Sequence, residues 1–142
     1  MRFFILAFGL IFSNFGVCVG FEIEDQRIYP AMNATQVLKV LSTADIASFD
    51  PLIKEFQTQN TEVSVNYTVA SSAQVMTAIY DENAAFDLVI SSAMDLQTKL
   101  ANDGYSQTFI SNNTARLPNW AKWQDQLFAF TQEPAALVIS DK

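Results

Sequence analysis

Residues 86–105 read FDLVISSAMDLQTKLANDGY, and this stretch carries the pattern that decides the fold. Its first five residues form a nearly continuous apolar run, which predicts a strand covered on both faces. The residues after the two serines place apolar side chains on one side of a helix, and Gly104 is a natural stop for that helix. Ser91 and Ser92 stand where the strand ends and the helix begins, so they either cap the helix or face a ligand.

Two further strand–helix units precede this one. Residues 37–41 and 62–69 have the β-branched and alternating patterns of strands. One helix is predicted to begin at residues 50–51 (Asp-Pro), because Asp caps helices and Pro fits their first turn. Another is predicted to begin at residues 71–72 (Ser-Ser). Strand and helix therefore alternate three times, which predicts an α/β fold with a mainly parallel sheet and helices on both faces.

The first 20 residues have the three-part pattern of a secretory signal peptide. Arg2 supplies a positive start, residues 3–15 are almost continuously apolar, and Gly20 is the small residue before a cut at Phe21. The apolar run is shorter than the roughly 20 residues that a membrane helix needs. We therefore expect residues 1–20 to be cleaved as the chain is exported.

Cys18 is the only cysteine of the chain. Residues 15–17 (Phe-Gly-Val) do not match the usual lead-in to a lipidated cysteine, so lipid anchoring at Cys18 is not expected. Without residues 1–20 the chain has no thiol and can form no disulfide. An exported protein of this kind suits a bacterial periplasm better than a disulfide-stapled secreted domain.

The rest of the chain is predicted to form one domain. Residues 21–36 are expected to be an irregular lead with a break at residues 29–30 (Tyr-Pro). Residues 37–142 are expected to form an α/β ligand-binding lobe. Two further strands are predicted at residues 126–130 and 135–139, after the third helix.

Charge and composition exclude several classes of function. The formal net charge is −7, and it becomes −8 without the leader because Arg2 is the leader's only charged residue. An acidic chain disfavours nucleic acid and anionic membranes as partners. The chain has no histidine, which removes Ser-His chemistry and histidine metal clusters. We therefore expect neither an enzyme nor a cofactor or metal site; a small hydrolase on the same frame is the alternative that this composition disfavours.

Small hydroxyl residues follow each of the three strands that precede helices. In parallel sheets, ligands bind outside the carboxyl ends of the strands, where these loops gather. The hydroxyls either cap their helices or hold the oxygen atoms of a ligand in a common cleft. The candidate ligand-binding residues are Ser42, Thr43, Ser71, Ser72, Ser91 and Ser92.

Five blocks of the sequence are similar to one protein family. They cover residues 41–45, 50–57, 91–105, 117–123 and 130–134. The blocks resemble the extracellular (periplasmic) solute-binding proteins of ABC importers, in the branch often labelled iron(III)-type or family 1. The resemblance runs from about Arg27 to Lys142, and the block at residues 91–105 is long enough to be specific.

This resemblance implies a fold, a function and partners. Such proteins have the type II periplasmic binding protein fold, in which two α/β lobes close on a ligand by a hinge motion. The chain then supplies the first lobe only and is truncated before the second. The implied function is capture of a small polar or anionic solute for import, with the membrane permease of an ABC importer as partner. The six hydroxyl residues match cleft-lining positions of the first lobe.

The resemblance does not imply iron binding here, and two alternative functions stay open. Iron-binding members use tyrosines of the second lobe and often a histidine of the first, and this chain has neither. The chain could instead be a ligand-sensing module for a membrane sensor kinase. It could also be a non-functional fragment, since a lone lobe loses about half of the ligand contacts.

Four other side chains and one carboxylate have simpler interpretations. Asp45 is predicted to cap or order its loop. Tyr67 and Tyr80 fall in regular apolar patterns and are predicted core residues. Trp120 and Trp123 are interpreted as one packed face of a short helix rather than a binding box.

Overall fold

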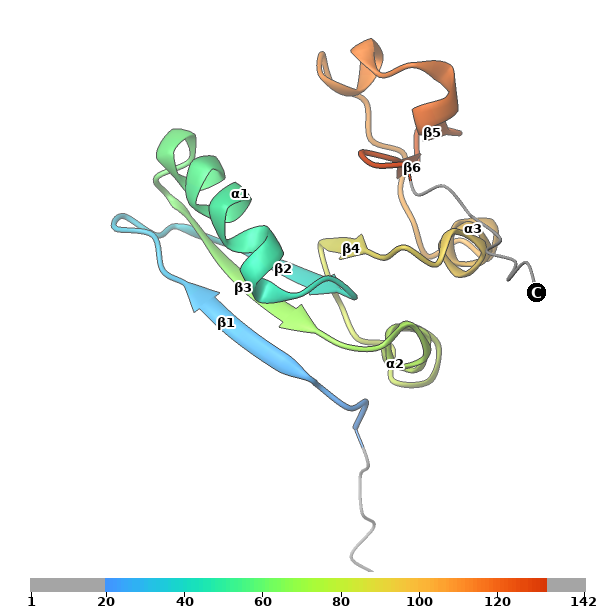
Figure 1. Ribbon diagram of the computed structural model, residues 1–142, viewed down its shortest axis with the longest axis horizontal. Coiled ribbons are helices and arrows are strands. Elements are labelled where there is room, and N and C mark those ends of the chain that lie inside the picture. The colour runs from blue at the N-terminus through green and yellow to red at the C-terminus, as the bar shows by residue number, and fades with distance from the viewer. Residues whose placement is uncertain (1–19, 133–142) are drawn as a thin grey trace, which may run out of the picture.

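A four-stranded sheet with helices on both faces organises the computed structural model, which describes residues 20–132 (Figure 1). The main elements are, in chain order, β1 (Asp25–Tyr29), β2 (Gln36–Ser42), α1 (Ile46–Gln59), β3 (Val63–Val69), α2 (Ser72–Met76), β4 (Leu88–Ile90) and α3 (Met94–Asn102). α2 continues directly into a π-helical turn, η1 (Thr77–Asp81). The 3₁₀ turns η2 (Thr114–Arg116) and η3 (Asn119–Ala121) and the short strands β5 (Lys122–Trp123) and β6 (Leu127–Phe128) complete the described part.

The sheet has the strand order β1-β3-β2-β4. β2 is parallel to both β3 and β4, whereas β1 runs antiparallel to β3 along its outer edge. This arrangement confirms the predicted α/β fold with a mainly parallel sheet. β5 and β6 form a separate antiparallel pair that lies apart from the large sheet (Figure 1).

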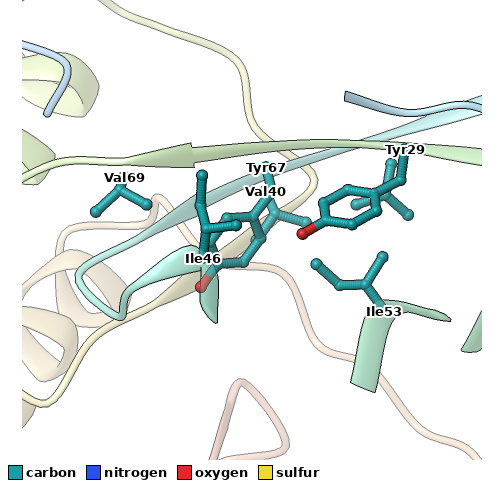
Figure 2. Close-up of a cluster of buried hydrophobic side chains, with 7 residues drawn as sticks. Tyr29, Val40, Ile46, Ile53, Tyr67 and Val69 are labelled. Atoms are coloured by element: carbon teal, nitrogen blue, oxygen red, sulfur yellow. The ribbon is translucent and has the colours of Figure 1, made fainter. Parts of the chain in front are cut away.

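Two hydrophobic clusters pack on opposite faces of the sheet. Successive residues of a strand point to opposite faces, and Val40 accordingly joins one cluster while Leu41 joins the other. The first cluster is covered by Ile46 and Ile53 of α1, and Figure 2 shows its side chains between the strands and that helix. The second is covered by residues of α2, η1 and α3. Helices therefore cover both faces, as predicted.

The lead at residues 21–36 is not irregular throughout, because it contains β1. Residues 25–29 pair with β3 in a continuous register from Asp25 opposite Val69 to Tyr29 opposite Val65. Four of the five residues are exposed, so β1 lacks the apolar alternation that would have marked it as a strand. The predicted break is confirmed, since β1 ends at Tyr29 and Pro30 follows.

Helix α1 begins at Ile46, five residues before the predicted start at Pro51. Pro51 lies inside the helix, where it cannot donate a backbone hydrogen bond. The earlier start brings Ile46, Phe49 and Ile53 onto one face: both isoleucines are buried and the Phe49 ring stacks on Tyr67. The free energy gained by burying these side chains offsets the loss of the backbone hydrogen bond that Pro51 cannot donate.

The predictions for the later strands are only partly correct. β4 is covered only in part: Ile90 packs against the first cluster and Val89 against the second, but both are half-buried and Leu88 is 45% exposed. Within residues 20–132, β4 pairs with β2 alone, so its other edge and much of its surface stay open. The strand predicted at residues 126–130 is shortened to β6, and the one predicted at 135–139 lies outside the described residues.

Candidate ligand-binding site

The three hydroxyl-rich loops lie side by side at the carboxyl edge of the parallel strands. The sheet register pairs Ser42 at the end of β2 with Val69 of β3 and with Ile90 of β4. Backbone hydrogen bonds continue this pairing, because Ala70 N donates to Ser42 O at 2.9 Å and Thr43 N donates to Ile90 O at 2.9 Å. The expected gathering of the loops at one edge is therefore present.

Ser42 points into the core rather than into solvent. Its side chain is fully buried, and its Oγ accepts a hydrogen bond from Ala44 N at 3.0 Å. The Tyr67 hydroxyl lies 2.8 Å from Ser42 Oγ and 3.0 Å from the Ala44 carbonyl oxygen. These contacts hold the loop between β2 and α1 in one conformation, so the Ser42 hydroxyl orders the loop in this structure.

Ser91 repeats the local geometry of Ser42. Its Oγ accepts a hydrogen bond from Ala93 N, two residues further on, at 3.1 Å. Its carbonyl accepts one from the Gln97 side chain at 3.1 Å. Neither serine of this pair caps α3, because the N-cap position is Ala93 and no side chain caps that helix. The Ser91 hydroxyl therefore orders the turn ahead of α3.

Ser71 is a helix cap. It occupies the N-cap position of α2, and its Oγ accepts a hydrogen bond from Gln74 N at 3.3 Å. This is the arrangement expected of a serine at a helix start. The Ser71-Ser72 pair thus begins α2 where the sequence predicted a helix to begin.

A common pattern links the three loops. In each pair the first hydroxyl, that of Ser42, Ser71 or Ser91, accepts a hydrogen bond from a nearby backbone N–H. The second hydroxyl of each pair is that of Thr43, Ser72 or Ser92. Within residues 20–132 none of these three hydroxyls has a hydrogen-bond partner. Ser92 is exposed, whereas Thr43 and Ser72 are half-buried. Of the two sequence interpretations, the helix cap applies to Ser71 alone, since Ser42 and Ser91 order turns instead. The ligand-facing role stays a prediction.

An open groove of about 660 Å³ lies at the same edge of the sheet, beside the start of α1. It is lined mostly by charged residues and by none of the six predicted site residues; the lining is Glu24, Asp25, Arg27, Asp45, Ile46, Ala47, Asp50, Lys54 and Val69. The groove was not predicted because Asp25 and Arg27 of β1 line it, together with Glu24 just before that strand. Asp45 occupies the N-cap position of α1 without a side-chain cap, and its carbonyl accepts from Ser48 N.

Asp50 joins β1 to α1 within that groove. Its carboxylate pairs with Lys54 at 2.7 Å and with Arg27 at 3.1 Å, and the Tyr29 hydroxyl donates to it at 3.2 Å. The hydrogen bond from Lys54, followed by the smaller effects of its charge and of Tyr29 and Arg27, lowers the pKa of Asp50. The spacing of Asp50 and Lys54, four residues apart, is the sequence signal that was available.

The predicted core tyrosines differ in their surroundings. Tyr67 is fully buried, as predicted, and burial raises the pKa of its hydroxyl. Tyr80 packs against the second cluster, but its hydroxyl donates to Asp103 at the surface. Lys99 pairs with the same carboxylate at 2.6 Å and, together with Tyr80, lowers the pKa of Asp103. Tyr80 therefore joins η1 to the end of α3.

The two tryptophans do not form one helical face. Trp120 lies in η3 and is 60% exposed, whereas Trp123 lies in β5 and is half-buried. The turn ends at Ala121, because Lys122 already has an extended backbone conformation. The spacing of three residues was therefore misleading, since no helix spans both positions.

Residues 20–132 contain neither a cluster of metal-ligating side chains nor a membrane-spanning helix. No three histidine, cysteine, aspartate or glutamate side chains in that range come together as a possible metal site. No helix among those residues has both the length and the apolar character that crossing a membrane requires.

Comparisons with known proteins place this geometry in a family. Residues 38–125 match the family of bacterial extracellular solute-binding proteins. Among eight matching solved chains is the crystal structure of the substrate-binding protein of the ABC transporter from Agrobacterium tumefaciens, with 35% sequence identity and a TM-score of 0.65. That match covers 71% of this chain but only 32% of the other. No curated protein matches the chain. The chain belongs to the bacterial extracellular solute-binding proteins.

Proposed function

We propose that this lobe forms one wall of a cleft that binds a small polar or anionic solute at the carboxyl edge of β2, β3 and β4. The observation that carries the proposal is the repeated pair of hydroxyls in three adjacent loops. Among residues 20–132, the hydroxyls of Thr43, Ser72 and Ser92 have no hydrogen-bond partner, and each lies beside a neighbour whose hydroxyl orders the loop or caps the helix. Free hydroxyls can donate to the oxygen atoms of a solute, and neutral donors add no charge of their own to the site.

Ser42, Ser71 and Ser91 have a supporting role in this proposal. Their hydroxyls accept hydrogen bonds from backbone N–H groups of the same loops or, for Ser71, of α2. They thereby keep the other hydroxyls in place without touching the solute. This division refines the six predicted site residues into three contacts and three ordering residues. It also explains why small hydroxyl residues occur in pairs.

We further propose that the lobe works opposite a second lobe that supplies the facing wall. The similarity to a solved protein of which this chain spans 32% supports this proposal. The finer assignment to the iron(III)-type branch stays a prediction, and the absence of histidine argues against iron as the solute.

The proposed setting is the periplasm of a bacterium, reached by cleavage of residues 1–20. The proposed partner is the membrane permease of an ABC importer. The substrate-binding protein from Agrobacterium tumefaciens, which belongs to an ABC transporter, supports transport over sensing. Neighbouring genes for a permease and an ATPase would agree with import, whereas a gene for a sensor kinase would favour the alternative.

A thermal-unfolding screen tests the proposal on the exported chain. Phosphate, sulfate, nitrate, glutamate and citrate serve as anionic probes, and putrescine serves as the cationic control. A solute at about 100 times its Kd stabilises the folded state by about 2.7 kcal/mol, which is readily seen as a rise in Tm. We expect at least one anion, and not putrescine, to raise Tm.

Two matched variants locate the binding. The triple change Thr43→Val, Ser72→Ala and Ser92→Ala is expected to abolish the rise in Tm. The double change Thr61→Val and Thr108→Val, at exposed positions away from the three loops, is expected to retain it. Binding that survives the triple change would overturn the site, and no response to any probe would contradict binding by this lobe alone. The same screen on the chain joined to a second lobe then tests the two-lobe proposal.

A further inference from the structure

The segment just before β1 is fixed by contacts on several sides. The Phe21 ring meets the Phe86 ring edge-on, with ring centroids 6.2 Å apart, and packs against the second hydrophobic cluster. Glu22 N donates to the Gln74 side chain of α2 at 2.8 Å, and Glu24 N donates to Val69 O at 2.9 Å. The backbone at Phe21 therefore has a defined position over α2 and η1.

A carboxylate lies beside the residue that precedes Phe21. The two carboxylate oxygens of Glu82 lie 3.9 and 4.0 Å from the point that a Cβ on Gly20 would occupy. Glu82 follows η1 directly, and its backbone N–H donates to Thr77 O at 3.2 Å, which holds it at the end of that turn. Within residues 20–132, Glu82 takes part in no ion pair.

We propose that cleavage between Gly20 and Phe21 creates a new α-ammonium group at Phe21 that pairs with Glu82. The inference rests on the cleavage proposed above. Hydrolysis adds one water across the Gly20–Phe21 peptide bond: the carboxylate leaves with residues 1–20, and the amine stays on Phe21. An α-amino group has a pKa of about 7.7–8.0 and is therefore mostly protonated at neutral pH. The neutral amide of the precursor carries no such charge, so only the processed chain forms this ion pair.

This contact gives the processed terminus a structural role. Phe21 anchors the terminus by its ring, and Glu82 holds the new charge on the η1 side. The segment between them is bonded to Gln74, in the helix that Ser71 caps. The processed terminus is thereby tied to the helix that follows one of the three candidate loops. Gly20 and Glu82 are both exposed. The ion pair between the Phe21 ammonium and Glu82 therefore fixes the position of the terminus more than it adds to the free energy of unfolding.

Zero-length carbodiimide crosslinking tests the proposal. The full chain is produced in a bacterial host and isolated from the periplasm, and its first residue is determined by mass spectrometry. Carbodiimide then joins amines to carboxylates in contact, with loss of one water. The pairs Lys54–Asp50 at 2.7 Å and Lys99–Asp103 at 2.6 Å provide internal positive controls. We expect a crosslink between the Phe21 amine and Glu82.

Two variants make the outcome specific. Glu82→Gln is expected to remove the Phe21 crosslink and to leave both lysine crosslinks in place, whereas the neighbouring Asp81→Asn is expected to change none. Recovery of both lysine crosslinks without Phe21–Glu82, or a Phe21 crosslink that survives Glu82→Gln, would overturn the inference. A first residue other than Phe21 would instead reject the proposed cleavage, and the two failures are thereby distinguished.

Discussion

The Tyr67 hydroxyl lies 2.8 Å from the Ser42 hydroxyl inside the first hydrophobic cluster, and both residues are fully buried. The same tyrosine reaches the Ala44 carbonyl oxygen at 3.0 Å, and its ring stacks on Phe49 with centroids 5.6 Å apart. One side chain of β3 thus supports both the loop after β2 and the first turn of α1.

Removal of the Tyr67 hydroxyl should destabilise the fold although the ring stays. Tyr67→Phe keeps the stack on Phe49 but removes the hydroxyl that lies within hydrogen-bond distance of the Ser42 hydroxyl and the Ala44 carbonyl oxygen. The loss of this buried polar contact costs about 1–3 kcal/mol. Urea unfolding measures the loss. Ser42→Ala should be destabilising too, and the double change should cost less than the two single changes together because the residues share a hydrogen bond. Strict additivity would contradict the coupling.

Tyr67 should also make stability fall at alkaline pH. Burial raises the pKa of its hydroxyl above the value near 10 of an unfolded tyrosine. A raised folded-state pKa contributes stability that is fully present below pH of about 10 and is lost as pH rises through the folded pKa. Urea unfolding between pH 9 and 11 (about the range of tyrosine titration) should show a smaller loss in Tyr67→Phe than in the parent. Burial raises the pKa of Tyr29 as well. Tyr29→Phe therefore measures the part of the alkaline loss in unfolding free energy that comes from Tyr29.

Protonation of Asp50 should lower the free energy of unfolding at acidic pH. Its pKa is lowered chiefly by the hydrogen bond from Lys54, so its contribution is present above the unfolded value of about 3.9 and is lost as pH falls through the folded pKa. Asp50→Asn should therefore flatten the fall in unfolding free energy below about pH 4. Asp103→Asn is the matched comparison, because its pKa is lowered by Lys99 in the same way. Identical acid profiles for Asp50→Asn and the parent would refute the role of this ion pair.

The two serines that start α2 should differ in their effect on stability. Ser71→Ala removes the N-cap acceptor of Gln74 N and is expected to cost about 0.5–2 kcal/mol. The bond length of 3.3 Å favours the lower end of that range. Ser72→Ala is the matched control, and we expect it to leave the urea midpoint nearly unchanged. The reverse ranking would show that Ser72, rather than Ser71, supports the helix.

Substitution of Gly104 should destabilise the fold because of its backbone conformation alone. Its φ of 86° lies in the left-handed region, yet a Cβ there would meet no atom within 4 Å. Gly104→Ala is therefore expected to cost about 1–2 kcal/mol from conformation and nothing from contact. Asn83 has a φ of 56°, so Asn83→Gly should be neutral or slightly stabilising. Equal urea midpoints for Gly104→Ala and the parent would contradict this assignment.

The elements that hydrophobic periodicity dictates were predictable from the sequence. β2, β3 and the start of α2 lie where their patterns placed them, because each buries the face that the pattern marks. β1 was missed because an edge strand with exposed side chains is specified by backbone hydrogen bonds to β3 rather than by its own alternation. The start of α1 was misplaced because the preference of Pro51 for a first turn is weaker than the burial of Ile46.

The candidate site was predictable as a place but not residue by residue. Parallel topology alone brings the three loops to one edge. Which hydroxyl of each pair is engaged depends on local turns and on Tyr67, which comes from another strand. The burial of Ser42 follows from the alternation along β2, since it shares the face of Val40. The groove beside α1 depends on β1, so it could not be foreseen without that strand.

The pairing of β1 with β3 has a consequence for the order in which the sheet assembles. β1 leaves the ribosome before β2, α1 and β3, yet its partner residues run up to Val69. Until β3 has followed, β1 has no neighbour to bond with, so local contacts alone cannot complete the sheet as the chain emerges. Completion of the sheet requires the long-range pairing of β1 with β3, which slows folding and leaves strand edges unpaired until then.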